Sequence, residues 1–351
     1  GGIRLMAYST IPKGSLYMSA KLYTGNGSSG HDITLPFSPD FTWIKERGAT
    51  QNHFLFDKVR GDNKYINSNT SDQEYTESGG MALGTNKFTL GNWGSVNNNS
   101  DTFASWNWKA NGQGSSNTAG SINTTYTSVN TTAGFSISSY TGTGSLATVG
   151  HGLGVAPSMI ITKVLTTTHN WGVYHQGLGN TSAIYLDLPN DKSDDAAWWN
   201  NTSPTSNVFT INTRVEVNQG SQNYISYCFA EKQGFSKFGI YTGNGATLGP
   251  FVYCGFKPSF IIVKKTSGSG SWWMRDNQIA PYNQRSQVIV ANSNGAETSG
   301  VAQMDFLSNG FKLRDTTDAS NSSGGSYIYM VFASNPFVAT SGSDAVPVTA
   351  E

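Results

Sequence analysis

One five-residue motif, Tyr-Thr-Gly-x-Gly, occurs three times in the chain, at residues 23–27, 140–144 and 241–245. A single copy would predict only a turn, since glycine and asparagine are ordinary turn residues. Five further blocks follow each copy in the same order: a proline, an apolar run, an aromatic segment, an Asn-x-Phe-x-Leu/Ile block and an aromatic-rich closing run. This order predicts a threefold internal repeat of about 100 residues, longer than a solenoid unit, so each repeat should form a module.

The blocks keep nearly constant spacing from repeat to repeat. The prolines lie 16 or 17 residues after the motif tyrosine. The landmarks are the prolines Pro39, Pro157 and Pro258, the predicted starts of the aromatic segments Phe54, Trp171 and Trp272, and the closing aromatics Trp108, Phe229 and Phe332. Because side chains alternate along a strand, Trp106, Tyr227 and Met330 should share a buried face with the closing aromatics.

The composition favours short β-strands. Glycine is abundant, with 40 residues, and the 9 Trp, 16 Tyr and 18 Phe suit pleated, half-buried surfaces. No helical periodicity extends beyond a turn or two. We therefore expect an all-β chain of three tandem antiparallel β-sandwich modules of similar topology.

Charge and cysteine content argue against several classes of protein. Basic and acidic residues number 22 each, so the net charge is zero and an electrostatic nucleic-acid binder is not expected. No run of about 18 apolar residues is present, so no membrane-spanning helix is expected, and we predict no signal peptide. Cys228 and Cys254 are too few for a zinc site. Two buried thiols are the favoured interpretation, and a single disulfide bridge stays open.

Changes in composition divide the chain into six segments. The first residues read as an extended arm, because Pro12 and Gly14 argue against a helix. Residues 110–150 carry no charged side chain, and part of this stretch is rich in β-forming residues. The predicted segments are an N-terminal arm 1–20, module one 21–110, an uncharged linker or added strand 111–133, module two 134–231, module three 232–337 and a tail 338–351.

No catalytic or metal-binding pattern is evident. The sequence has no Gly-x-Ser-x-Gly elbow and no phosphate-binding loop of the GxxxxGK[ST] type. The five histidines, at positions 31, 53, 151, 169 and 175, lack metal-ligand spacing, so ordinary structural histidines are favoured over a metal pair at 169 and 175. We therefore expect a non-enzymatic protein without a metal or cofactor.

One acidic and aromatic stretch is the candidate binding site. Asp191, Asp194 and Asp195 precede Trp198 and Trp199. Carboxylates beside tryptophan rings are typical of glycosidases and lectins, and carboxylates can also hold Ca²⁺. A solvated acidic loop is the favoured interpretation, ahead of a glycan or ion site, with catalysis last. The candidate glycan-binding residues are Trp198, Trp199, Asp194, Asp195 and Trp273, the last because neighbours on a strand face opposite ways.

Several stretches resemble a family of virion structural proteins of tailed bacteriophages, common in phages of marine bacteria and often described as tail or fibre proteins. They are residues 6–17 (MAYSTIPKGSLY), 106–112 (WNWKANG), 148–154 (TVGHGLG), 306–314 (FLSNGFKLR) and 325–329 (GSYIY). The resemblance implies a tail-fibre or other appendage subunit that exposes β modules to a host surface glycan. Two alternatives stay open: a capsid decoration or head-fibre protein, and a glycan-active virion enzyme.

The resemblance also bears on assembly. Phage fibres gain rigidity by trimerising, so it implies a homotrimer among other virion proteins, located on the particle. Three modules in one chain could instead form a threefold cluster without partner chains. We expect association, with residues 1–20 and 110–130 at a subunit or particle interface, because an uncharged strand can add to a neighbouring sheet edge. Trp198 and Trp199 should then face outward.

Overall fold

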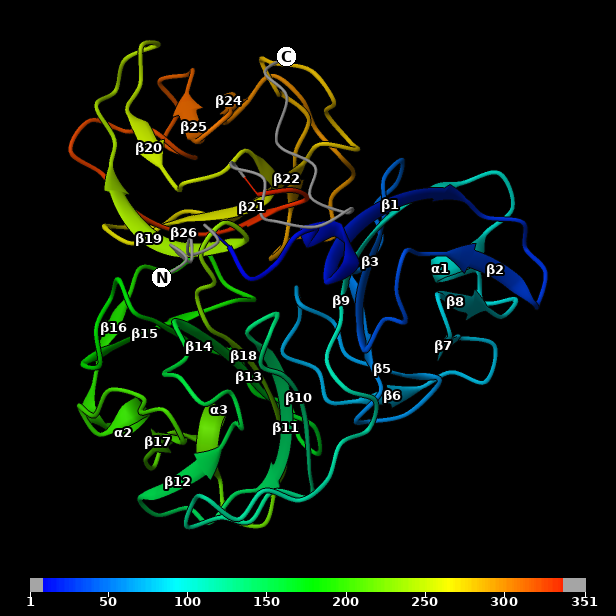
Figure 1. Cartoon of the computed structure of the whole chain (residues 1–351), viewed down its shortest axis with the longest axis vertical. Coiled ribbons are helices and arrows are strands. Elements are labelled where there is room, and N and C mark those ends of the chain that lie inside the picture. The colour runs from blue at the N-terminus through cyan, green and yellow to red at the C-terminus, as the bar shows by residue number, and fades with distance from the viewer. Residues whose placement is uncertain (1–8, 337–351) are drawn as a thin grey trace, which may run out of the picture.

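The computed structural model describes residues 9–336 and has three β-rich lobes, one for each repeat, grouped around a common centre (Figure 1). The strands pair in antiparallel sheets. The prediction of an all-β chain is therefore confirmed. The helices α1 to α3 are only four residues long, so none of these spans a membrane.

Repeat one has a four-stranded and a three-stranded sheet. The larger sheet consists, in spatial order, of β1 (Met18–Thr24), β9 (Thr102–Trp108), β3 (Phe41–Glu46) and β4 (Phe54–Asp57). The smaller sheet consists of β2 (His31–Thr34), β8 (Lys87–Leu90) and β7 (Met81–Gly84). A separate hairpin pairs β5 (Lys64–Tyr65) with β6 (Tyr75–Thr76), and α1 (Gly94–Asn97) precedes β9.

Repeat two has the largest sheet, with seven strands. In spatial order these are β10 (Tyr126–Asn130), β11 (Phe135–Thr141), β18 (Asn223–Phe229), β13 (Met159–Val164), β14 (Gly172–His175), β15 (Ser182–Tyr185) and β16 (Ser193–Asp194). The smaller sheet pairs β12 (Ala147–Gly150) with β17 (Val208–Ile211), and the helices are α2 (Ala196–Trp199) and α3 (Val215–Asn218). The β-forming stretch before repeat two is thus an added strand, β10, on the edge of this sheet.

Repeat three has a five-stranded and a three-stranded sheet. The larger sheet consists of β19 (Ser236–Thr242), β26 (Ser326–Ala333), β21 (Pro258–Lys265), β22 (Trp272–Asp276) and β23 (Ile289–Val290). The smaller sheet consists of β20 (Phe251–Tyr253), β25 (Gly310–Leu313) and β24 (Met304–Leu307).

The three large sheets share one strand order. The orders β1-β9-β3-β4, β11-β18-β13-β14 and β19-β26-β21-β22 correspond strand by strand. Pro39, Pro157 and Pro258 each lie two residues before the residue that pairs with the closing aromatic. The landmark prolines therefore occupy the same point in every repeat, as the repeat hypothesis requires.

The strand register corrects one landmark. Pairing between the third and fourth strands makes His53 the equivalent of Trp171 and Trp272. The prediction that Phe54 is equivalent is wrong by one residue, and such a shift moves a side chain to the other face of the sheet. Phe54 accordingly packs in the core of repeat one, whereas Trp171 and Trp272 lie in the core shared by all repeats.

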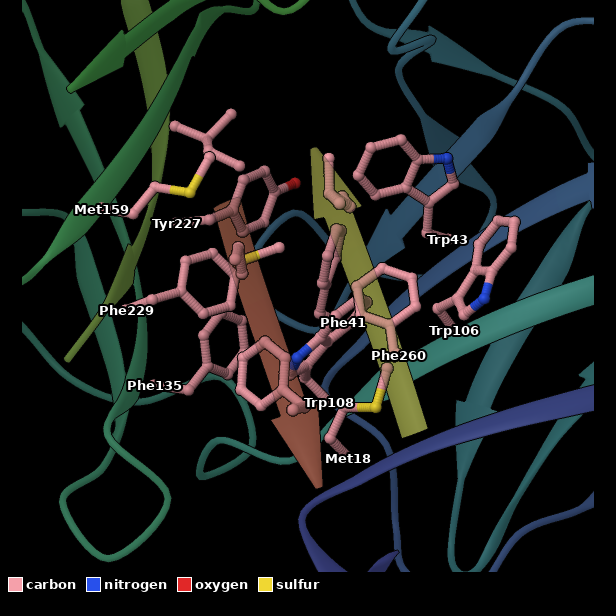
Figure 2. Close-up of a cluster of buried hydrophobic side chains, with 14 of the residues drawn as sticks. Met18, Phe41, Trp43, Trp106, Trp108, Phe135, Met159, Tyr227, Phe229 and Phe260 are labelled. Carbon is pink, nitrogen blue, oxygen red and sulfur yellow. The ribbon is translucent and has the colours of Figure 1, made fainter. Parts of the chain in front are cut away.

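Both faces of each large sheet are buried. One face packs on the smaller sheet of its own repeat, and the other contributes to a central core that all three repeats share (Figure 2). Trp108, Phe229 and Phe332 meet in this core, with ring centroids 5.9 to 6.2 Å apart. The predicted buried face is confirmed. The description as three tandem sandwiches is not confirmed, because the shared core joins the repeats into one ring.

The Tyr-Thr-Gly-x-Gly motif closes the outer end of each repeat. Its tyrosine stacks on the first aromatic ring of the closing strand, and its hydroxyl donates to a backbone carbonyl 2.7 to 2.8 Å away. The stacked pairs are Tyr23–Phe103, Tyr140–Tyr224 and Tyr241–Tyr327. The last glycine of each motif has φ between 67° and 72°, a region that favours glycine. The motif is therefore a structural turn.

A buried asparagine holds each of these turns. Its side-chain oxygen accepts a hydrogen bond, 2.7 to 3.0 Å long, from the backbone N–H of the fourth motif residue. Its side-chain nitrogen donates to a carbonyl of the same loop. The three residues are Asn97, Asn218 and Asn321. Sequence analysis missed them, although each lies eleven residues before its closing aromatic.

The described part of the N-terminal arm packs inside the molecule. Contrary to the expectation of an extended arm, residues Gly14–Leu16 form a 3₁₀ turn. Ile11 is buried in the shared core, Tyr17 packs edge-on against Phe235, and the Ser15 N–H donates to the Ser334 carbonyl at 2.9 Å. This segment therefore links repeat one to repeat three. Residues 1–8 and the predicted tail lie outside the described residues.

Both cysteines are buried free thiols, so the bridge that the sequence left open is not formed. Burial raises the pKa of Cys254 to about 12 and raises that of Cys228 further.

Candidate functional site

The predicted tryptophan pair does not face outward. Trp198 and Trp199 are 0% and 2% exposed, so the expectation of stacking platforms there is wrong. The reason lies in β14, where Gly172 has no side chain: a Cβ there would lie 2.8 Å from the Trp198 ring, which fills the space. The Arg214 guanidinium covers the ring at 4.7 Å.

The predicted carboxylates make local structural contacts. Asp194 accepts hydrogen bonds from Lys192 and Ser182, and these contacts lower its pKa. Asp195 caps α2 by accepting from the Ala197 N–H at 2.8 Å, and its other oxygen lies 3.5 Å from Arg214. Residues 9–336 contain no cluster of side chains suited to a metal ion.

Trp273 is half-buried on β22, and its indole N–H has no partner among the described residues. It occupies the sheet position of Phe54 and Gly172 in the other repeats. The expectation of an exposed ring is therefore met only in part.

Three histidines are buried structural groups held neutral. In His53, His151 and His175 the Nδ1 atom lies 2.8 to 3.2 Å from an N–H donor, and the Nε2 atom lies 3.0 to 3.2 Å from a carbonyl oxygen. This pattern requires a neutral ring with its proton on Nε2. Burial lowers the pKa of His53 to about 3 and those of the other two to about 4.

A ring of equivalent hydrogen bonds joins the repeats. At each junction a ring nitrogen of one repeat donates to a backbone carbonyl at the equivalent point of its neighbour. The bonds run from His53 to Val290 at 3.0 Å, from Trp171 to Asn67 at 2.9 Å and from Trp272 to Tyr185 at 2.7 Å. The junctions therefore follow one another cyclically around the centre.

A second, inner set of polar contacts follows the same cycle. The Tyr227 hydroxyl donates to Asp57 at 2.7 Å, and the Trp106 indole donates to Asp276 at 2.8 Å. In the third junction the position of these aspartates is taken by His175, which donates to the Tyr329 carbonyl at 3.1 Å. Burial raises the pKa of Asp276. Both carboxylates are therefore buried and hydrogen-bonded to a neighbouring repeat.

The apolar runs end in three equivalent buried lysines, which sequence analysis did not single out. Each ammonium group donates to backbone carbonyls, and in repeats two and three some of these belong to a neighbouring repeat. Burial lowers the pKa of Lys45, Lys163 and Lys264 to about 8. A lysine at the same place in each apolar run is unusual, because charged residues are rarely buried in strands. This recurrence in the sequence could have identified them.

A cavity of about 330 Å³ lies between repeats one and two. Arg60, Lys64 and Glu74 line one side of it. Glu74 lies 3.1 Å from Lys64 and 3.6 Å from Arg60, and Arg60 also pairs with Asp57 at 2.5 Å. Because these charges compensate one another, the cavity holds an internal ion network.

A group of neighbouring aromatic rings reaches the surface in repeat one. Trp93, Tyr65 and Tyr75 form a row, here named the aromatic row, with successive ring centroids 4.8 and 5.6 Å apart and planes inclined by 36° and 33°. Phe54 forms its floor, with its ring 4.6 Å from Trp93. Trp93 and Tyr65 are half-buried, and Tyr75 is 40% exposed. Sequence analysis missed this site because its members come from β5, β6 and the residue before α1.

One family model matches the chain. It describes a domain of unknown function, DUF7483, and covers residues 13–336, from just before the 3₁₀ turn to the end of repeat three. No curated protein matches the chain. The match takes in all three repeats and the shared core apart from Ile11. The chain therefore belongs to the DUF7483 family, whose function is unknown.

Proposed function

We propose that the chain is a non-enzymatic structural protein of a phage virion, a tail-fibre or other appendage subunit that attaches the particle to a host surface glycan. One observation carries the proposal: each recurring motif has a structural role. The motif tyrosines close the repeat ends, the prolines lie at the start of the third strand or two residues before it, and the closing aromatics fill the shared centre. The resemblance of residues 6–17 and 106–112 to virion proteins supports the location on a particle.

A capsid decoration or head-fibre role is the second candidate, because a closed ring of repeats also suits a protein that sits on a shell. The glycan-active enzyme has less support. Its best carboxylates, Asp194 and Asp195, are engaged in ion pairs and a helix cap.

The assembly state has two candidates. The resemblance to fibres favours a homotrimer. The ring geometry favours a monomer, since repeat one meets repeat three within a single chain, where Arg47 and Glu297 form a paired salt bridge at 2.6 and 3.2 Å. Light scattering decides between them: a 37.6 kDa species at micromolar concentration supports the monomer, and three times that mass supports the trimer.

Purified particles of the encoding phage test the location. An antibody against the chain should label the particle in immunogold electron microscopy, and mass spectrometry should find the chain at constant stoichiometry. Label on the tail or its appendages supports the first candidate, and label on the head supports decoration. A chain absent from washed particles would refute both.

A further inference from the structure

The aromatic row is not required by the repeated fold. Trp93 is equivalent to Arg214 in repeat two and to Thr317 in repeat three, counted from the buried asparagine of each turn. Tyr75 lies on β6, in a hairpin that forms its own two-stranded sheet in repeat one. Since the same architecture forms in the other repeats without these rings, their presence calls for another explanation.

The row also carries unused hydrogen-bonding groups. The hydroxyls of Tyr65 and Tyr75 and the indole N–H of Trp93 make no hydrogen bond within residues 9–336. Asp72 and Glu77 flank Tyr75 in the chain, and after burial their negative charges help to raise the pKa of Tyr65. Asp72 interacts electrostatically with buried Lys163, whose pKa burial lowers and this charge helps to raise, whereas Glu77 forms no ion pair with another described residue.

Rings with a polar edge match the surface of a sugar. A pyranose has an apolar face of C–H groups that packs on an aromatic ring, and hydroxyls around its edge that need both donors and acceptors. Tyr and Trp provide an apolar body with one polar atom, and a carboxylate accepts two hydroxyl hydrogen bonds. The aromatic row and its two carboxylates contain both kinds of group.

The carboxylates next to the aromatic row favour neutral sugars over acidic ones. Glu77 forms no ion pair with another described residue, and nearby Lys64 is already paired with Glu74 at 3.1 Å. A uronic acid or sulfated sugar would bring a further negative charge next to these carboxylates, which is unfavourable. We propose that Trp93, Tyr65 and Tyr75 form a binding site for neutral hexose units of a glycan. This inference deepens the proposed attachment function by naming the site and the ligand class.

The site is tested with the full purified chain and four probes. Maltohexaose, cellohexaose and mannohexaose represent neutral glycans, and hexagalacturonate represents an acidic one. Titration is followed by calorimetry and by tryptophan fluorescence, which Trp93 should report because it lies at the surface. We expect at least one neutral probe to bind with millimolar or tighter affinity, and hexagalacturonate to bind more weakly.

Two variants locate the binding. Tyr75→Ala should weaken the binding of the neutral probe by about tenfold, the effect of losing one ring contact, and Trp93→Phe should remove most of the fluorescence response. The matched control is Tyr282→Ala, a more exposed tyrosine in repeat three, 80% exposed, which should leave binding unchanged. Thermal unfolding of each variant checks that the fold is retained.

Three outcomes would overturn the site: no binding of any neutral probe at millimolar concentration, equal effects of Tyr75→Ala and Tyr282→Ala, or tighter binding of hexagalacturonate. These results are independent of the particle experiment. A chain that binds neutral sugar but is absent from virions would refute the proposed function alone, and a virion chain without sugar binding would refute the site alone.

Discussion

Repeats one and two each place a tryptophan over the same position of the large sheet, but in opposite environments. In repeat one, Phe54 fills the sheet surface, so Trp93 rests against it and stays half-exposed. In repeat two the equivalent sheet residue is Gly172, and the Trp198 ring fills the space and is buried. A tryptophan near acidic residues is thus a surface group only when the sheet beneath it is already filled.

The largest difference in stability is expected when the Trp198 and Trp93 rings are each truncated to alanine. Trp198→Ala should lower the free energy of unfolding by about 3–5 kcal/mol, because it leaves a cavity in a close-packed core. Trp93→Ala should have a clearly smaller effect, since part of the ring is already in water. Urea unfolding of both variants measures the difference. Equal losses would show that the two environments are alike.

Lowering the pH should reduce the free energy of unfolding through the buried histidines of repeat two. The aromatic row contains no histidine, so this effect does not arise there. His175 has a folded pKa of about 4, below its ordinary 6.5, so the unfolded chain takes up the proton first. Its contribution to stability is present above pH 6.5 and is lost as the pH falls towards 4, by about 3 kcal/mol. The measurement is the free energy of unfolding against pH.

The comparison variant is His175→Gln, which cannot titrate. The stability difference between wild type and this variant should shrink as the pH falls from 6.5 to 4, and subtraction removes the effects of all other titrating groups. A difference that is constant over this range would contradict a buried neutral His175.

Filling the space under Trp198 should displace the ring. In Gly172→Ala the new Cβ would lie 2.8 Å from the Trp198 ring and 3.1 Å from Val217, so overpacking should destabilise by about 1–3 kcal/mol. Gly48→Ala is the matched control, because a Cβ there meets nothing within 4 Å. Urea unfolding and tryptophan fluorescence compare them. No loss of stability in Gly172→Ala would mean that Trp198 does not occupy this space.

The smallest effects are expected at the exposed carboxylates of repeat two. Asp195→Asn keeps a good helix cap and loses only an exposed ion pair, so its melting temperature should match the wild type. Asp194→Asn changes a side chain that is 60% exposed and should also leave unfolding unchanged. Neither protein should release reducing ends from host polysaccharide. Release by the wild type that Asp194→Asn abolishes would favour the enzyme alternative instead.

The sequence by itself determined the repeat, its order of blocks and the buried face of the closing strands. These are local patterns: alternation places Trp106 and Trp108 on one face whatever the neighbouring strands are, and the glycines of the motif require a turn wherever it occurs. The asparagine before each closing strand was within reach of the same method, because its distance from the closing aromatic is constant.

Only the tertiary structure decided how the repeats meet and which rings reach the surface. The equivalence of His53, rather than Phe54, with Trp171 depended on strand register. An alignment of the repeats that allows shifts of one residue cannot settle this register. Burial of Trp198 depended on Gly172, 26 residues earlier in the chain. The aromatic row brings together residues from positions 65 to 93. Such outcomes depend on long-range contacts, and packing decides them only once the sheets have formed.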